Sequence, residues 1–173
     1  MDDFELYWTF KTKFDFIHGR MLSFAFSSAA KPADVIRQTF NALQPGGFLE
    51  LQDISLSFRT NDDSIGTEMK RWSNMLRRVA WESGRDWDCS AKYRKLLLEA
   101  GYEDVNEIML EWPINDKTEM GMWGRTNLLD CLEPISMAPM TRYLGISKEQ
   151  VMEIVERVKK EINQKGLEAS IPV

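Results

Sequence analysis

The chain has 173 residues and a formal net charge of −5, with 43% hydrophobic and 28% charged residues. This composition is ordinary for one globular domain with a real core, and the acidic balance argues against a nucleic-acid surface, which normally needs a basic patch. No apolar run approaches the roughly 20 residues that cross a bilayer, and two cysteines with one histidine disfavour a Cys/His zinc site. We expect a single domain over residues 1–173 in a reduced, intracellular protein, cytoplasmic with the nucleus left open.

The first predicted elements are a strand, a helix and a strand. KFDFIHGRM (13–21) is short, apolar and aromatic, which favours a buried strand. KPADVIRQTFNAL follows, with Pro32 where a first helical turn tolerates it and apolar residues at helical spacing. The Pro-Gly-Gly sequence at 45–47 stops this helix, and FLELQDISLSF (48–58) is the second strand. The succession predicts a βαβ unit with parallel strands.

The middle of the chain predicts two helices and a third strand. Residues 66–83 carry an apolar stripe at helical spacing, and SAKYRKLLLEAG is a shorter helix with Ser90 as its N-cap and Gly101 at its end. EDVNEIMLEWPI (103–114) alternates loosely and indicates a strand that Pro113 closes.

The C-terminal part contains the clearest helix of the chain. Residues 116–145 are irregular and predict only short helices. In SKEQVMEIVERVKKEINQKG, Ser147 and Gln150 match a capping box, apolar residues form a stripe, and Gly166 fits the C-cap. LEASIPV then begins a final strand.

Several stretches, in this order, resemble one family. They are FDFIHGRM, VIRQTFNALQPGGFLELQD, MKRWSNML, EAGYEDVNEIMLEWPI, GRTNLLDCLEP and TRYLGISKEQV. Together they resemble the class I S-adenosylmethionine (SAM) methyltransferases, in particular a fungal group related to trans-aconitate methyltransferases that acts mostly in secondary metabolism. The resemblance implies an α/β fold, the C-terminal half of a Rossmann-like methyltransferase sheet with about four strands and covering helices.

The resemblance also implies a SAM-binding part that this sequence lacks. In the family, the first strand ends in a glycine-rich loop beside the methionine part of SAM, because the backbone must come close to the ligand there. This chain has no such loop, and its start, MDDFELYW, resembles the segment after the family's third strand. We therefore expect an N-terminally truncated polypeptide, or a gene model that starts too late, that binds the family's cofactor SAM weakly by itself.

Four residues match what the resemblance implies of the cofactor site. Asp3 corresponds to the acidic residue that reaches the adenine amino group, although Phe4 stands where the family usually has a small residue; alternatively, Asp3 belongs to a solvated acidic N-terminus. His18, Gly19 and Arg20 end the first predicted strand, where ligands of open parallel sheets bind. The alternatives are a structural histidine and an arginine that holds a helix C-terminus or a carboxylate.

Catalytic residues stay unknown at this stage. Methyl transfer needs mainly alignment of donor and acceptor, with sometimes a base, and no nucleophile–base pair is apparent. Asp53, at the end of the second predicted strand, is the best-placed base, with structural hydrogen bonding as its alternative role.

An acceptor site is expected in MGMWGRTNLLDCLEPISMAPM. The chain is rich in methionine and tryptophan, with ten and six, and such side chains either fill a core or line a pliable pocket. This segment is either a lid over a small-molecule substrate, with Met120, Met122 and Trp123 lining the pocket, or a cover for the sheet.

Two classes of function stay open. The first is a SAM-dependent methyltransferase that acts on a small molecule in secondary metabolism and that is inactive alone if truncated. The second is a repurposed, non-methylating fold that binds or cyclises a small molecule or serves as an interaction subunit. Because the resemblance implies that strand 14–20 is an exposed edge, a homodimer or a partner protein is expected to use that edge.

Overall fold

The computed structural model describes residues 3–61 and 66–173. The chain forms two compact α/β units, which confirms the predicted fold class at this level. We call them the first unit, Met1–Ile54 with Gly84–Ile108, and the second unit, Ser55–Ser83 with Met109–Val173. The expectation of a single domain stays a prediction.

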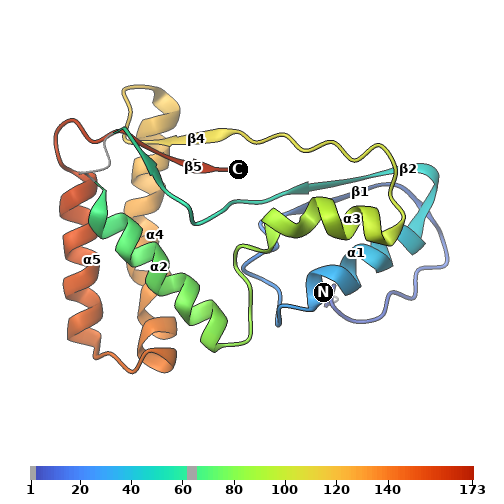
Figure 1. The fold of residues 1–173 in the computed structure, drawn as a ribbon, viewed down its shortest axis with the longest axis horizontal. Coiled ribbons are helices and arrows are strands. Elements are labelled where there is room, and N and C mark those ends of the chain that lie inside the picture. Colours follow the sequence, from blue (N-terminus) through green and yellow to red (C-terminus); the bar gives the residue numbers. More distant parts are fainter. Residues whose placement is uncertain (1–2, 62–65) are drawn as a thin grey trace. The chain divides into compact units, whose positions relative to one another are not determined.

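The first unit contains the predicted βαβ arrangement. Strands β1 (Phe14–Arg20) and β2 (Leu43–Gln52) pair in parallel, and α1 (Lys31–Ala42) connects them (Figure 1). Pro32 lies in the first turn of α1, as expected.

Strand β2 differs from its prediction at both ends. It begins at Leu43 and runs through Pro45, so the Pro-Gly-Gly sequence does not turn the chain away from the sheet. The pairing register shifts opposite this stretch, which absorbs its irregular backbone. The strand stops at Gln52 because the chain then passes to the second unit, where Leu56 and Phe58 are buried.

One face of the β1–β2 pair is covered and the other is open. Ile17, Leu49 and Leu51 are partly buried on the covered face. On the open face Phe16 is 54% exposed and Phe48, its partner across the strands, is 73% exposed. The prediction of a buried strand over residues 13–21 is therefore wrong for this face.

The core of the first unit lies between α1, the 3₁₀ turn η1 (Cys89–Lys92) and α3 (Tyr93–Ala100), around Phe26 and Val35. Ser90 lies inside η1 and is not the N-cap of α3, so that prediction is wrong: Lys92 precedes the helix without a side-chain cap. Gly101, in the left-handed conformation (φ 101°), ends α3 as predicted.

Three helices and a small antiparallel sheet make up the second unit. The helices α2 (Thr67–Glu82), α4 (Glu119–Tyr143) and α5 (Lys148–Ile162) pack on one another, and the strands β3 (Arg59–Thr60), β5 (Ala169–Pro172) and β4 (Glu111–Ile114) pair in that order (Figure 1). The predicted helices over 66–83 and after Ser147, with its capping box to Gln150, are confirmed.

Three expectations for residues 103–166 are wrong. The third strand shrinks from 103–114 to β4, because the apolar side chains before it, such as Ile108, stay exposed. Pro113 lies inside β4 and does not close it, which an edge strand tolerates. Gly166 lies three residues beyond Asn163, the actual C-cap of α5.

Residues 116–145 contain one long helix where short ones were expected. Helix α4 has 25 residues and includes Pro134 and Pro139. Small or polar residues, Gly121, Gly124 and Ser136, occupy half of its buried positions. The sequence therefore shows no apolar stripe at helical spacing, although the helix has a buried face.

Candidate functional site

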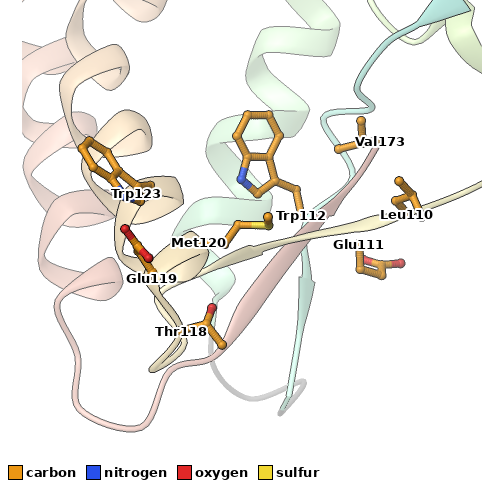
Figure 2. A pocket seen from close by; sticks show the side chains of 8 residues that line it. All are labelled: Leu110, Glu111, Trp112, Thr118, Glu119, Met120, Trp123 and Val173. Carbon is orange, nitrogen blue, oxygen red and sulfur yellow. The ribbon is translucent and has the colours of Figure 1, made fainter.

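An open hollow of about 860 Å³ lies in the second unit between β4 and the start of α4 (Figure 2). We call it the apolar hollow. It is lined by Leu110, Glu111, Trp112, Thr118, Glu119, Met120, Trp123 and Val173.

Local sequence brings α4 close to β4 at this place. The Thr118 hydroxyl accepts a hydrogen bond from the Gly121 amide at 3.0 Å and so fixes the first turn of α4. A Cβ atom on Gly124 would lie 2.3 Å from the Pro113 carbonyl oxygen, so only glycine permits this approach. The side chains of the first helical turns therefore lie beside the strand.

Few polar groups of the hollow are uncommitted. Glu111 pairs with Arg59 and accepts a hydrogen bond from Ser170 Oγ at 2.7 Å. The Thr118 hydroxyl is bound within its own turn, to Asp116 and the Gly121 amide. Among the described residues, the Glu119 carboxylate has no hydrogen bond or ion pair, and it lies in the first turn of α4, where the helix dipole favours negative charge.

The structure brings together two of the three residues predicted for substrate binding. Met120 and Trp123 line the hollow, whereas Met122 is 56% exposed and does not line it. Sequence reasoning missed Trp112 and Glu119. The signal for Glu119 was its place directly after Thr118, a good N-cap residue, at the start of the methionine-rich segment.

A buried polar cluster lies where β1 and β2 end. Asp53 Oδ2 accepts hydrogen bonds from the Ser23 amide at 2.9 Å and from the Tyr93 hydroxyl at 2.8 Å. Cys89 Sγ is 3.4 Å from Ser23 Oγ and 3.6 Å from the Tyr93 hydroxyl. Burial raises the pKa of the Cys89 thiol and of the Tyr93 phenol, so both stay protonated at neutral pH. This geometry suits the structural role of Asp53 better than that of a free base.

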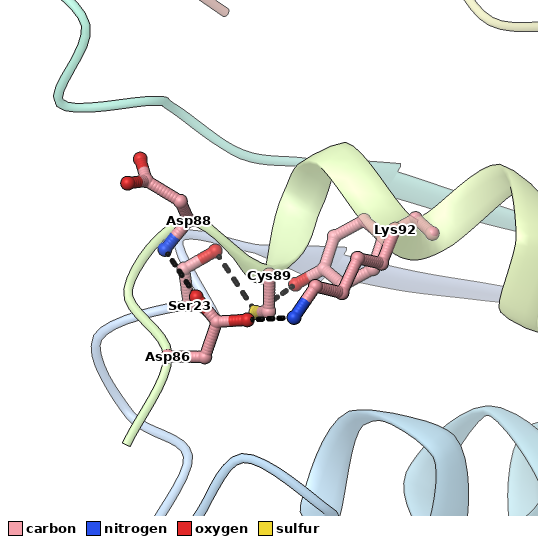
Figure 3. A network of polar contacts seen from close by, with 6 residues as sticks. Ser23, Asp86, Asp88, Cys89 and Lys92 are labelled. Atoms are coloured by element: carbon pink, nitrogen blue, oxygen red, sulfur yellow. Dashed lines mark hydrogen bonds and ion pairs between the residues drawn. The ribbon is translucent and has the colours of Figure 1, made fainter. Parts of the chain in front are cut away.

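An exposed ion pair borders this cluster. Figure 3 shows Ser23 and Cys89 near Asp86 and Lys92, whose carboxylate and ammonium groups are 2.6 Å apart. The hydrogen bond and charge of Asp86 raise the pKa of Lys92. The pair holds the segment that leads into η1.

The predicted cofactor residues lie in the first unit but do not form one polar site. Because side chains alternate between the two faces along β1, the exposed His18 and Arg20 lie on the same face as Phe16. The rings of His18 and Phe16 are stacked, with their centroids 6.3 Å apart. A Cβ atom on Gly19 would lie 2.7 Å from Leu22 Cδ1, so this glycine makes room for a neighbouring side chain.

Asp3 also makes a local contact. Its carboxylate accepts a hydrogen bond from the Glu5 amide at 2.9 Å and caps a turn of the N-terminal segment. The exposed Asp3 is not among the residues that line the cavity of the first unit. Its role toward a cofactor stays a prediction.

A cavity of about 240 Å³ in the first unit tests whether these residues fit SAM. His18 and Gly19 contribute to its wall, together with apolar side chains that include Phe4 and Trp8. SAM carries an amino acid and a ribose, whose polar groups need partners when they are buried. Among residues 3–61 and 66–173 no carboxylate lines the cavity, and its volume is below the roughly 300–1,000 Å³ usual for ligand pockets. The described residues alone do not fit SAM.

Two features are absent from the described ranges, 3–61 and 66–173. No group of three or more His, Cys, Asp or Glu side chains there could hold a metal ion. No helix there is long and apolar enough to cross a membrane. The compartment of the protein stays a prediction.

Comparison with known proteins decides the relationship. Over 96% of its length the chain is 27% identical to the probable methyltransferase tdiE of Emericella nidulans, of which it covers 54%. It is also 25% identical, over 96% of its length, to the protein-methionine methyltransferase laeA of Emericella nidulans, and 27% identical, over 95%, to the secondary metabolism regulator laeA of Aspergillus fumigatus. It covers 46% of each of these two proteins. The chain is methyltransferase-like.

These similarities confirm the resemblance to the fungal secondary-metabolism methyltransferases. No protein-family model matches the chain. The methyltransferase-like chain spans about half the length of the curated relatives it matches.

Proposed function

We propose that this chain takes part in SAM-dependent methylation of a small molecule in fungal secondary metabolism, with the acceptor in the apolar hollow. The similarity to methyltransferases over nearly the whole chain carries this proposal. The hollow supports it, because small-molecule sites are concave and mostly apolar with a few placed polar groups.

The proposal includes a finer view of the fold. In this view the chain corresponds to the C-terminal half of a Rossmann-like methyltransferase fold, and its described strands form two sheets, β1–β2 and β3–β5–β4. The order of strands and helices along the chain supports this view, together with the similarity to methyltransferases.

SAM would supply the methyl group, but no step of the transfer follows from the residues described. The cavity of the first unit does not fit the cofactor, and Asp53 is held by two hydrogen-bond donors. The contribution that this chain's residues support is on the acceptor side, where Met120, Trp112 and Trp123 exclude water and orient a ligand.

One observation favours the second class of function, a fold that binds a small molecule without methylating it. Gly19 is used for packing against Leu22, and Asp3 for capping a turn. Two of the four residues matched to the cofactor site thus have structural uses, while the hollow in the second unit is independent of them.

The test is methyl transfer by the protein as expressed from its natural gene. The protein is incubated with SAM labelled in the methyl group and with pools of small aromatic acceptors, and products are identified by mass spectrometry. We expect a labelled product whose mass rises by one methyl group, and loss of that product in Trp123→Ala. Acceptor binding in the hollow without transfer, in a protein that binds SAM, would favour the second class.

We further propose that a second copy of the chain docks on β1. In the described part of the chain β1 pairs with β2 alone, so one edge of β1 has unpaired backbone N–H and C=O groups. The exposed Phe16 lies beside this edge.

A further inference from the structure

We propose that the apolar hollow selects ligands that carry a positive charge on an aromatic body, such as an aryl-alkyl ammonium ion. The inference names the class of substrate that the acceptor site would take. It rests on the proposed function in one respect, namely that the hollow is a ligand site. Three features of the second unit support it: an unpaired carboxylate, two indole rings and the lack of basic side chains in the lining.

The carboxylate is that of Glu119. The other acidic side chain in the lining, Glu111, pairs with Arg59 and accepts a hydrogen bond from Ser170. Glu119 has no such partner in the described part of the chain and lies in the wall of the hollow. A ligand ammonium group would gain a charge-assisted hydrogen bond there without displacing a protein cation.

The indole rings give the same preference. Trp123 lies one helical turn after Glu119, at the i,i+4 spacing that brings two side chains to the same face of α4. Trp112 comes from β4, and Met120 lies between the two elements (Figure 2). The π-face of an indole attracts cations and stacks on aromatic rings, and the methionine thioether adapts to the ligand's shape.

No basic group in the lining opposes this choice. The described residues of the lining include no Lys, Arg or His, and the nearby Arg59 is paired with Glu111. Among the described side chains of the wall, Glu119 is therefore the one carboxylate without a cationic partner. A neutral aromatic ligand would use only the apolar walls, and an anionic ligand would meet repulsion from Glu119.

The proposal is tested with three small probes of nearly the same shape. Phenethylamine is cationic at neutral pH, 2-phenylethanol is neutral and 3-phenylpropionate is anionic. Affinities are measured by calorimetry on the full chain, and the site is identified from the indole N–H signals of Trp112 and Trp123 in NMR spectra. We expect phenethylamine to bind about two- to fivefold more tightly than 2-phenylethanol and 3-phenylpropionate to bind weakest, with the preference reduced at high salt.

Variants separate the charge from the shape of the hollow. Glu119→Gln should abolish the preference for the cation and leave the affinity for 2-phenylethanol unchanged. The control Glu133→Gln removes an exposed carboxylate elsewhere on α4 and should change nothing. Trp123→Ala should weaken binding of all three probes.

The outcomes distinguish this inference from the proposed function. Equal affinities in the wild type, or a cation preference that survives Glu119→Gln, would overturn the inference while leaving an acceptor site in the hollow. If no probe shifts either indole signal, both the inference and the place of the acceptor in the proposed function are wrong.

Discussion

At the scale of single residues, the absence of one side chain shapes the candidate site. Gly124 lets α4 approach the backbone of Pro113, and this approach places Met120 and Trp123 beside β4. The glycine position therefore matters to the site although Gly124 does not line the hollow.

The first prediction concerns this contact. In Gly124→Ala the new methyl group would meet the Pro113 carbonyl oxygen, an atom that cannot move without shifting β4. We expect a loss of about 1–3 kcal/mol in the free energy of unfolding and weaker probe binding in the hollow, measured by urea denaturation and calorimetry. Asn127→Ala, an exposed change on the same helix, is the control, and equal stability of the two variants would contradict the contact.

The second prediction concerns alkaline pH. Burial raises the pKa of Cys89 above its ordinary 9.0 and that of Tyr93 above 10.0, and Asp86 raises that of Lys92. Each of these groups holds its proton more tightly in the folded state. Its stabilising contribution is therefore complete below the unfolded pKa and is lost as pH rises from there toward the folded pKa.

The expected result is a urea midpoint that falls steadily from about pH 9 upward. Cys89→Ala should flatten the first part of this fall. The Cys89→Ala variant should still show part of the fall in the midpoint, because burial also raises the pKa of Cys131. Cys131→Ala therefore serves as the companion variant. A midpoint that stays constant through pH 11 would show that these groups ionise freely in the folded protein.

At the scale of elements, the sequence predicts a helix best where its buried residues recur at regular helical spacing. The stripes of α2 and α5 are apolar at every third or fourth position, and both helices appear where expected. Helix α4 has glycine and serine at buried positions, so hydrophobic spacing could not predict it.

The candidate site could be predicted in part. The methionine and tryptophan cluster indicated Met120 and Trp123, because their residue types, more than their spacing, suggest a ligand surface. The pairing of Glu111 with Arg59, which leaves Glu119 as the free carboxylate, depends on tertiary contacts that no local pattern carries.

The third prediction asks whether the start of α4 serves ligand binding or the core. Trp123 is 67% exposed, so Trp123→Ala should change the free energy of unfolding by no more than about 0.5 kcal/mol. Ligand affinity should fall on the order of tenfold, because an aromatic wall is lost. Trp81→Ala removes another exposed tryptophan of the second unit and should affect neither quantity. A variant that only lowers the melting temperature would assign Trp123 to the core.

At the scale of the whole molecule, the sequence is similar to methyltransferases, but the cavity of the first unit does not fit their cofactor SAM. The sequence similarity extends over 96% of the chain, yet none of the carboxylates that the structure describes lines the cavity of the first unit. The Thr39 hydroxyl in its wall is already hydrogen-bonded to Ile36 and Tyr102. Relationship and cofactor binding by this polypeptide must therefore be tested separately.

The fourth prediction is that the chain alone binds SAM weakly or not at all. Each missing hydrogen bond to the cofactor removes about 1 kcal/mol or more, and several together remove orders of magnitude in affinity. Calorimetric titration of the pure chain measures this directly. Micromolar binding that His18→Ala abolishes would contradict the prediction and would show that the wall of this cavity holds SAM in an unexpected way.

The fifth prediction concerns association through the first unit. Phe16 and Phe48 lie opposite each other on the open face of β1–β2, 54% and 73% exposed, next to a strand edge without a partner in the described part of the chain. Apolar side chains beside unpaired backbone groups favour pairing with another strand. Light scattering coupled to size exclusion should show a dimer whose fraction rises with concentration. Phe16→Lys should shift the equilibrium to monomer because a charge would be buried in the contact.

The control is Tyr7→Lys, which changes an 86% exposed aromatic residue outside the sheet and should leave the dimer intact. A wild-type chain that stays monomeric at high concentration would mean that the open face and edge are covered from within the same molecule.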